Sequence, residues 1–417
     1  MTQSHHTAAA GDDSGRYVTL GRCIAVDVAT FASRYWGQRP SLTRAAVLPR
    51  DFSDLLDIAA VDELVSRRGL RAPFLRMARD GTVIPAGRFT RGGGAGATIS
   101  DQVADDLVLS LLDDGATLVL QGLHRTWPPL VSFAARLTAE VGHPLQVNAY
   151  VTPPQSQGFS AHYDVHDVFV LQVTGRKRWC VHAPVLVDPL PDQPWDHRKT
   201  EVAARAAEPP LIDTVLEAGD ALYLPRGYLH SATALGEVSV HLTVGIHPRT
   251  RADLIDHLIH AARMDSPLRA SLPMGVDLTD PAILETQLRR TVDALCQVLD
   301  TVPAEHIATA LADDLIGSTR PEPLSPLAQL SAVERLDADT SLERRPGLRW
   351  RMGRDAAEVA LTLLDKTVRL PANCEAALKI AFSGSTFTPR ELPGLEPGEQ
   401  LVLARRLLRE GVLIPSA

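Results

Sequence analysis

The alternation of apolar and polar residues between positions 146 and 248 limits the possible folds of this chain more than any other feature. Short segments there have the two-residue period of β-strands and are separated by turns rich in Pro, Gly and Asp. The predicted strands are residues 146–152, 168–173, 178–182, 222–225 and 238–246. Many short strands with frequent turns are typical of a sandwich or a small barrel. A polar insertion at 189–205 is predicted to form a loop over one barrel mouth.

Helical spacing of apolar residues replaces this alternation on both sides of the predicted barrel. In the first 145 residues, helices are expected at 51–67, at 100–112 with Ser100 as the N-cap, and at 128–141. Beyond residue 248, they are expected at 252–264, 281–299 and 302–311. A Pro-rich stretch around 321–326 then precedes a last compact segment of short helices and a hairpin.

These patterns predict an α+β protein of several domains, in keeping with its 417 residues. Residues 1–16 are expected to be a polar tail, and residues 17–248 a domain that contains the barrel. Residues 249–335 are expected to be helical. Short helices that end in a hairpin indicate a small winged-helix module at residues 340–417.

Charge and cysteine content exclude several classes of function. The chain has 42 Lys and Arg against 50 Asp and Glu, a net charge of −8, so it lacks the basic character of a nucleic-acid-binding protein. Residues 331–417 carry 13 Lys and Arg against 12 Asp and Glu, so the predicted winged helix has no basic footprint for DNA. The four cysteines are far apart and form no CxxC pair, which argues against a disulfide scaffold and a thiolate zinc site. A bound metal would therefore need imidazole and carboxylate ligands.

Neither an export signal nor a membrane span is expected. Residues 1–16 contain no apolar core and their first charges are acidic, unlike those of a signal peptide. No segment approaches about 18 uninterrupted apolar residues. We therefore expect a cytoplasmic protein with reduced thiols and no membrane contact.

The chemically informative residues begin with His162-Tyr163-Asp164. In an extended strand the first and third of these side chains face the same side. An imidazole and a carboxylate on one face supply two thirds of the 2-His-1-carboxylate triad that holds non-heme Fe(II). That triad leaves coordination positions open for a cosubstrate and dioxygen. An H-x-D sequence is common on its own, so it needs a third ligand.

The third ligand is expected to be His230. It follows the turn at residues 225–227 and is placed to face back into the barrel. A hydrogen-bonded turn histidine is the plain alternative for His230. His241, on the next predicted strand, is the alternative ligand.

Lys177 offers a cation for an acidic cosubstrate. It begins a predicted strand and lies 15 residues after His162. Lys177 and Trp179 share one face of that strand, whereas Arg176 and Arg178 share the other. A solvated basic turn is the alternative interpretation of these residues.

Two further pairs of polar residues are candidates for the same pocket. Asn148 and Tyr150 share one face of their strand, where they either hydrogen-bond a cosubstrate or satisfy buried polar groups of the barrel. His241 and Thr243 are likewise paired and are candidates to support the ligands from behind.

Together these residues stand in two stretches, NAYVTPPQSQGFSAHYDVHDVFVLQVTGRKRW and GDALYLPRGYLHSA, which resemble the JmjC-type ribosomal oxygenases. Those are Fe(II)- and 2-oxoglutarate-dependent enzymes that hydroxylate side chains of ribosomal proteins. The resemblance extends to FASRYWGQRP at residues 31–40. It implies a double-stranded β-helix, the jelly roll of the JmjC and cupin proteins, followed by a helical dimerisation region and a winged-helix domain.

The resemblance also assigns roles to single residues. His162, Asp164 and His230 match the iron ligands, and Lys177 matches the lysine that pairs with the 2-oxoglutarate carboxylate. Tyr150 falls where the family has a tyrosine that assists this contact, and Asn148 matches the same motif. The roles of all of these residues remain expectations at this point.

One residue departs from the family pattern. This chain has His166 where the family often has an acidic or polar residue. By strand parity His166 shares a face with Asp164. It either lines the substrate channel or faces solvent after a bulge.

The implied function is hydroxylation of a histidine or arginine side chain of a ribosomal protein, with Fe(II), 2-oxoglutarate and O2. A homodimer is implied as well. The apolar stripe of residues 281–299 would then be its interface rather than ordinary core. The alternatives are a hydroxylase of peptides or small-molecule natural products, an N-methyl-lysine demethylase, and a non-catalytic cupin-like binding protein.

Overall fold

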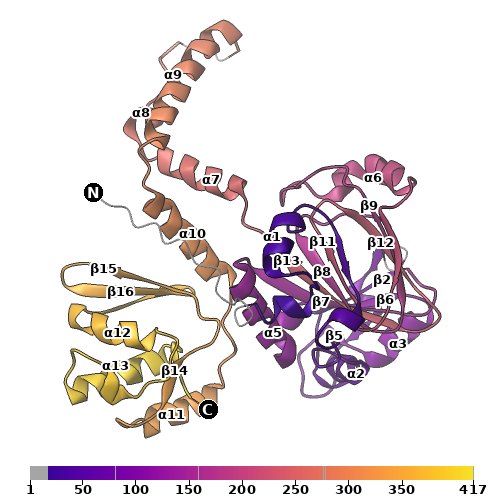
Figure 1. Ribbon diagram of the computed structural model, residues 1–417, viewed down its shortest axis with the longest axis horizontal. Coiled ribbons are helices and arrows are strands. Elements are labelled where there is room, and N and C mark those ends of the chain that lie inside the picture. The colour runs from indigo at the N-terminus through magenta and orange to yellow at the C-terminus, as the bar shows by residue number, and fades with distance from the viewer. Residues whose placement is uncertain (1–16, 80, 158, 276, 278, 417) are drawn as a thin grey trace. The chain divides into compact units, whose positions relative to one another are not determined.

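The computed structural model describes residues 17–79, 81–157, 159–275, 277 and 279–416 (Figure 1). The tail predicted for residues 1–16 lies outside the described residues. The chain divides into two compact units, Met1–Pro248 and Arg249–Ala417.

A large antiparallel sheet is the central element of the first unit, with the strand order β1-β11-β8-β13-β7-β6-β2-β3. Its strands are β1 Ser41–Thr43, β2 Leu75–Arg79, β3 Thr82–Ile84, β6 Thr117–Leu120, β7 Leu145–Thr152, β8 Asp167–Thr174, β11 Ala221–Leu224 and β13 Ser239–Ile246. The predicted strands at 146–152, 168–173, 222–225 and 238–246 are confirmed to within one residue at each end.

A second sheet of three antiparallel strands lies against the first. It consists of β9 (Lys177–His182) between β10 (Ile212–Leu216) and β12 (Leu229–Ala234). Val170 and Leu222 of the large sheet share one hydrophobic cluster with Trp179 of the small sheet. The two sheets therefore pack face to face, as the predicted jelly roll requires.

Each central strand of the large sheet divides its side chains between two layers. On β7, Val147 and Ala149 join a hydrophobic core that includes Leu64, Leu111 and Phe133 from three helices. Tyr150, on the other face, points toward the small sheet. The helices of this unit are α1 Val28–Arg34, α2 Ile58–Arg67, α3 Asp105–Asp113, α4 Leu123–Thr126, α5 Pro128–Val141 and α6 Lys199–Ala206.

Two predicted helices begin later than expected. Helix α2 starts at Ile58, because the carboxylate of Asp57 accepts a hydrogen bond from the amide of Ala60 at 2.7 Å and caps it there. The prediction of a helix from Ser100 was wrong for its first turn. Gln102–Val103 form strand β5, which pairs with β4 (Thr90–Arg91), so α3 begins at Asp105 without a side-chain cap.

The insertion is more ordered than predicted. It contains helix α6, and the unpredicted strand β10 follows it. Val202 of α6 is buried in a small cluster with Tyr163 and Leu229. The insertion therefore packs against the segment that holds the H-x-D sequence.

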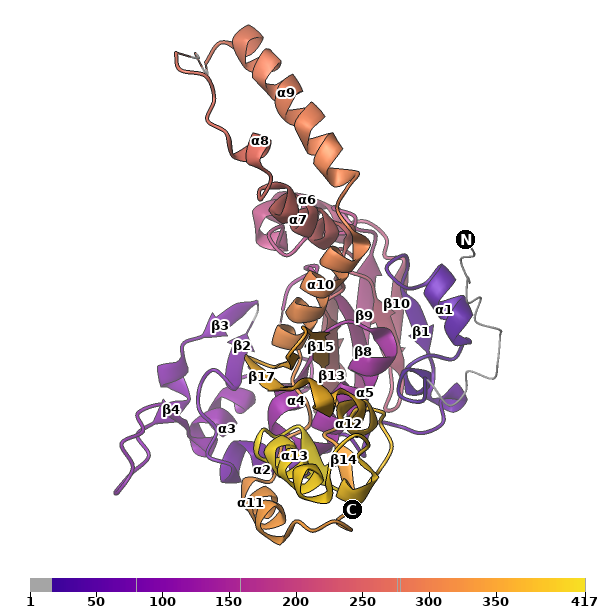
Figure 2. The ribbon, with the colours of Figure 1, turned by 90° about the vertical axis from the view of Figure 1, so that its left-hand side faces the viewer.

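The second unit begins with helices and ends with a small mixed domain. The helices are α7 Arg251–Ala262, α8 Ser266–Arg269, α9 Pro281–Leu299, α10 Ala304–Ser318 and α11 Pro326–Arg335. Helix α9 has no buried residue in the described chain, and α8 runs beside it (Figure 2). Helix α10 is longer than the predicted residues 302–311.

The rest of the second unit has its own hydrophobic core. It contains a three-stranded meander and a two-stranded pair, with two helices packed on them. These elements are β14 Leu342–Arg344, β15 Trp350–Arg354, β16 Glu358–Leu363, β17 Lys366–Pro371, α12 Glu375–Ala381, α13 Pro397–Arg409 and β18 Leu413–Pro415. Within the described ranges, none of the helices combines the length and hydrophobicity needed to cross a bilayer.

Gly175, in the turn between β8 and β9, fixes how closely this turn approaches β13. Its φ is +66°, and a Cβ added there would lie 2.2 Å from the carbonyl oxygen of Val238. Gly236 has a similar φ of +71°, but an added Cβ would meet nothing nearer than 3.9 Å. The turn that carries Lys177 into the barrel therefore depends on glycine for space as well as for conformation.

We predict that Gly175→Ala destabilises the first unit more than Gly236→Ala does. The control substitution should cost about 1 kcal/mol, because only the left-handed backbone is penalised. Gly175→Ala should cost roughly 2 kcal/mol more, because the turn must also move away from Val238. Urea unfolding measures the free-energy cost of each substitution, and hydrogen exchange in β8 and β13 shows whether the cost falls on these two strands. Equal costs would contradict the predicted clash.

Candidate active site

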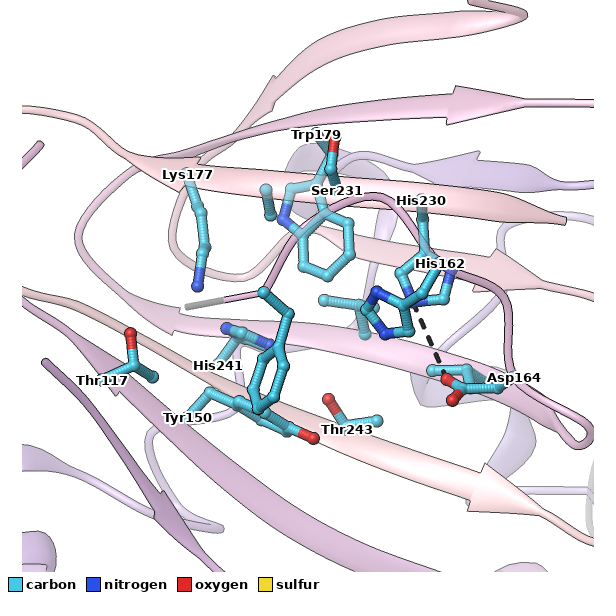
Figure 3. A pocket seen from close by; sticks show the side chains of 14 residues that line it. Thr117, Tyr150, His162, Asp164, Lys177, Trp179, His230, Ser231, His241 and Thr243 are labelled. Atoms are coloured by element: carbon cyan, nitrogen blue, oxygen red, sulfur yellow. Dashed lines mark ion pairs between the residues drawn. The ribbon is translucent and has the colours of Figure 1, made fainter. Parts of the chain in front are cut away.

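A cavity lies between the two sheets and collects most of the residues singled out from the sequence. The side chains of His162, Asp164 and His230 lie at one end of the cavity, and the side chain of Lys177 enters it at the other end (Figure 3). The lining residues are Thr117, Tyr150, Phe159, His162, Asp164, Val168, Val170, Lys177, Trp179, His230, Ser231, Ala232, His241 and Thr243.

The backbones of His162 and His230 join the two halves of the site. The His162 amide donates to the His230 carbonyl at 3.2 Å, and the His230 amide donates to the His162 carbonyl at 2.8 Å. His162 forms only this isolated bridge, so the predicted strand through Asp164 was wrong. His230 is part of β12, and the bridge brings the two imidazole centroids to 4.5 Å.

Both imidazoles are oriented by the same local contact. The Nδ1 of His162 lies 2.8 Å from the carbonyl oxygen of Ser160, and the Nδ1 of His230 lies 3.1 Å from that of Tyr228. A carbonyl can only accept, so each Nδ1 carries the donated proton, and each Nε2 is the nitrogen left to bind a metal. This orientation by a backbone oxygen is typical of metal-binding histidines.

Asp164 completes a group of three possible metal ligands. Ligand atoms of His162, Asp164 and His230 all lie within 4.8 Å of one another. Burial acts to raise the pKa of Asp164, but the surrounding imidazoles, His166 first and then His230 and His162, lower it below its ordinary value. Burial lowers the pKa of His230 to about 4, and the neighbouring His162 adds to this. Asp164 is therefore a carboxylate and His230 a neutral imidazole, the states that bind metal.

The turn before His230 is held by a buried carboxylate. Asp167 accepts hydrogen bonds from the Tyr223 hydroxyl at 2.7 Å and from the Arg226 amide at 3.0 Å. Gly227 then donates its amide to the Asp164 carbonyl at 3.0 Å. Its φ is +87°, and a Cβ there would lie 2.5 Å from the Leu186 carbonyl. The turn thus ties Asp164 to the strand that carries His230.

Lys177 is a buried cation without an anionic partner. Its side chain is nearly inaccessible, and its ammonium donates to the Thr152 hydroxyl at 2.9 Å. Thr152 in turn accepts from Thr117 at 3.2 Å. Burial lowers the pKa of Lys177 to about 7. No carboxylate pairs with it in the part of the chain that the structure describes.

The other polar residues of the cavity lie on β7 and β13. Tyr150 and His241 are cross-strand partners and stack at 5.0 Å. Burial raises the pKa of Tyr150 to about 12, with a further increase from Asp164. Burial, followed by the charge of Lys177, lowers the pKa of His241 well below its ordinary value. His241 lies outside the three-residue group, whereas Thr243 lines the cavity beside it.

Two residues proposed from the sequence do not line the cavity. The side-chain oxygen of Asn148 accepts a hydrogen bond from the Gly122 amide at 3.1 Å, which satisfies a buried polar group as the alternative interpretation expected. The Nε2 of His166 lies 3.4 Å from the side-chain Nε2 of Gln146, and the His166 ring packs against His247 at 5.0 Å between ring centroids. Its role as a channel residue thus has no support from the lining of this cavity.

Sequence reasoning missed several cavity residues. Thr117, Phe159 and Ser231 line the cavity, and Thr152 is the hydrogen-bond partner of Lys177. Strand parity could have found Thr152, because it shares a face of β7 with Tyr150. Thr117 gave no comparable signal, since it lies on β6, which was not predicted.

Comparison with known proteins agrees with this architecture. A JmjC domain model matches residues 131–254. Ribosomal oxygenase 1 of Gallus gallus is 37% identical over 150 residues, which cover 34% of this chain and 24% of that protein. The crystal structure of the Escherichia coli ribosomal oxygenase YcfD aligns with a TM-score of 0.53 at 19% identity, covering 94% of this chain and 98% of that chain. Residues 131–254 therefore match a JmjC domain, and the chain is similar in sequence and fold to ribosomal oxygenases.

A second relative matches over a longer part of this chain. The bifunctional lysine-specific demethylase and histidyl-hydroxylase NO66 of Aedes aegypti is 27% identical over 329 residues, which cover 72% of this chain. The match covers 47% of that relative, so this chain spans about half of the relative's length. A further structure of YcfD, in complex with cobalt and 2-oxoglutarate, aligns with a TM-score of 0.51 at 19% identity. The JmjC and cupin fold of the first unit is thereby established.

We predict that Lys177 makes the stability of this JmjC unit depend on pH. The pKa of Lys177 is about 7 in the folded protein, whereas the ordinary value of 10.5 applies to the unfolded chain. Between pH 7 and pH 10.5 the unfolded chain therefore binds more protons than the folded protein. The free energy of unfolding of the wild type relative to Lys177→Met should rise by about 2 kcal/mol from pH 7 to pH 9. Urea unfolding of both proteins across this range checks it. A difference independent of pH would contradict the lowered pKa.

Proposed function

We propose that this chain is an Fe(II)- and 2-oxoglutarate-dependent oxygenase that hydroxylates a histidine or arginine side chain of a ribosomal protein. The observation that carries the proposal is the pairing of two features in one cavity. The three-residue ligand group lies at one end, and a buried lysine without an anionic partner lies at the other. A small dianion bound to a metal would satisfy both.

The donor set suits ferrous iron. Two imidazole Nε2 atoms and one carboxylate on one side of the metal form the facial triad of non-heme iron oxygenases, with the remaining positions open. His162, His230 and Asp164 would supply them. The Nδ1 atoms of the two histidines and the backbones of all three residues are already held by hydrogen bonds. Thiolate ligands, which would favour zinc, are absent from the described residues around the cavity.

The opposite end of the cavity suits the far carboxylate of 2-oxoglutarate. Lys177 would donate to it, with Thr152 and Thr117 behind the ammonium. The indole nitrogen of Trp179 and the Nδ1 of His241 are buried without partners among the described residues, so they offer further polar contacts. Tyr150 and Thr243 line the same space. When bound, iron and 2-oxoglutarate supply dioxygen activation, with release of succinate and CO2.

The protein itself supplies orientation and a dry site. Val168, Val170 and Trp179 form apolar walls between the metal end and the lysine end. Such walls exclude water and strengthen the contact of Lys177 with an anion. The hydrogen bonds to Ser160 and Tyr228 fix both imidazoles before any ligand arrives.

The names of the relatives support the proposed substrate class. Relatives bear the names ribosomal oxygenase and histidyl-hydroxylase. The net charge of −8 also favours encounter with basic ribosomal proteins. A ribosomal-protein substrate implies the cytoplasm as the place of action. One relative's name includes lysine-specific demethylase, so N-methyl-lysine demethylation is the second candidate.

The decisive experiment compares ribosomal proteins from wild-type cells and from cells that lack this chain. Mass spectrometry should find one histidine or arginine that carries an additional oxygen atom only in the wild type. Purified enzyme with Fe(II) and 2-oxoglutarate should restore it. Formaldehyde in place of a stable oxygen addition would indicate demethylation. No change in any ribosomal protein, despite turnover on an added peptide or natural product, would favour a different hydroxylase.

We predict that His230→Ala abolishes iron binding and reduces succinate formation by at least a hundredfold, because one of the three ligands is lost. Lys177→Met should retain iron and raise the half-saturating 2-oxoglutarate concentration at least tenfold, because the distal carboxylate loses its cation. The exposed His197, in the insertion, provides the control His197→Ala. Metal content and a 2-oxoglutarate titration measure these effects. Full iron content in His230→Ala would contradict the ligand assignment.

We also propose that the second unit forms a homodimer and ends in a winged-helix-like domain for protein contact. Helix α9 buries none of its residues in the described chain, and its Leu288 is 54% exposed. Leu288→Asp should therefore shift the protein from dimer to monomer in light scattering. Leu109→Asp is the control, because Leu109 in the first unit is 67% exposed, and this substitution should leave the dimer intact. A monomeric wild type would contradict the dimer.

A further inference from the structure

Arg76, on β2, lies on the cavity side of the large sheet. Arg76 is directly opposite Val119 on β6, and Val119 is opposite Tyr150 on β7. Residues directly opposite each other in antiparallel strands project from the same face of the sheet. Tyr150 and its partner His241 line the cavity, so Arg76 belongs to the same row of side chains.

The guanidinium of Arg76 has no partner in the described chain. Its Nε is buried and forms no hydrogen bond, and Arg76 takes part in none of the ion pairs among the described residues. Arg79, on the same strand, is exposed and donates to the Asp114 carbonyl at 3.3 Å. A guanidinium with a buried, unpaired nitrogen is costly unless an acceptor arrives.

The hairpin that carries Arg76 reaches the segment of the metal-ligand candidates at its turn. In the turn between β2 and β3, a Cβ added at Gly81 would lie 3.0 Å from the hydroxyl of Ser160. The carbonyl of Ser160 holds the imidazole of His162. The charge of Arg76 also reaches Tyr150, where it acts to lower the tyrosine pKa against the dominant effect of burial.

The cosubstrate leaves Arg76 without a role. In the proposed function, one carboxylate of 2-oxoglutarate chelates the metal and the other meets Lys177, at the level of Thr152 on β7. Arg76 is level with Tyr150, which precedes Thr152 by two residues on β7. Arg76 itself lies on β2, two strands away from β7 in the sheet. Asp164 is the one carboxylate among the described residues that line the cavity, and the metal would use it.

We propose that Arg76 is a substrate-recognition residue that binds an acceptor oxygen of the polypeptide whose side chain is hydroxylated. This inference rests on the proposed function. The acceptor is a backbone carbonyl or an acidic side chain close to the target residue. The planar fork of the guanidinium donates to either in a fixed direction and so sets how the polypeptide lies over the metal.

The test compares Arg76→Met with the matched control Arg79→Met. Salt-extracted ribosomal proteins from cells that lack this chain are the substrate, and hydroxylation is followed by mass spectrometry. Arg76→Met should raise the half-saturating concentration of these proteins at least tenfold. The half-saturating 2-oxoglutarate concentration and the succinate formed without protein substrate should stay within twofold of wild type. Arg79→Met should change none of these values.

Other outcomes overturn the inference. An unchanged half-saturating protein concentration in Arg76→Met would show that the guanidinium does not bind substrate. A rise confined to 2-oxoglutarate would place Arg76 in the cosubstrate site. If Arg76→Met does not fold, Arg76→Lys replaces it, because lysine keeps the charge and stem but loses the fork, and the same rise is expected.

Two further measurements separate this inference from the proposed function. Wild-type protein that forms no succinate from 2-oxoglutarate contradicts the proposed function. Binding of the same ribosomal proteins to immobilised wild type and Arg76→Met needs no turnover and should still differ, and equal binding overturns the role of Arg76. In the substrate protein that is identified, neutralising acidic residues beside the target distinguishes the acceptors, since only a carboxylate contact would be weakened.

Discussion

The site depends on the pair of backbone hydrogen bonds between His162 and His230. Before it, the chain leaves β7 of the large sheet through a loop, and after it the chain returns to β8 of the same sheet, whereas β12 belongs to the small sheet. A second bridge, between Gln157 and Thr233, pairs the preceding part of this loop with β12, and the bridge at residue 162 continues that contact to the ligand candidates. With it, both imidazoles lie 4.5 Å apart, and each Nδ1 meets a carbonyl two residues earlier in the chain. The bridge therefore sets the distance between the imidazoles, and the two carbonyl contacts set their orientation and tautomer.

The charges of the cavity are arranged for ligands that are themselves anionic or metallic. Lys177 is buried with the Thr152 hydroxyl as its partner among the described residues, and His241 is buried beside it. Each group has a lowered pKa, which is the consequence of desolvating a cation. A folded protein keeps such groups at a cost in stability. That cost is offset when an anion enters, so affinity for an acidic ligand and strain in the free site have the same cause.

The sequence was most informative where residues of a suitable chemical type stand on or beside a segment with a clear strand period. The H-x-D pair, His230 and Lys177 could be found from their residue types, from the turn before His230 and from the strand parity at Lys177, and the structure brings all four to one cavity although no strand forms at His162. The predictions that were wrong depended on pairing between distant segments. Gln102 and Val103 form a strand because β4 pairs with them, and His162 forms a bridge instead of a strand because β12 meets it at one residue. Asn148 was assigned to the cosubstrate because parity shows the face and not the partner, which is the Gly122 amide. Arg76 and Thr117 lie on strands β2 and β6, which periodicity did not reveal.

The loop that carries the ligand candidates is restrained as firmly as a strand, although it has almost no regular structure. His162 is held by the bridge, the Tyr163 hydroxyl donates to the Gln193 carbonyl at 2.9 Å, and the Asp164 carbonyl accepts from Gly227. Three consecutive residues are thus anchored to β12, to the insertion and to the turn before β12. A site restrained at every residue loses little conformational entropy when a metal binds. The insertion at residues 189–205, which on polarity alone looked like a loose covering loop, is one of these restraints, and its helix α6 explains why it has a fixed position from which to act.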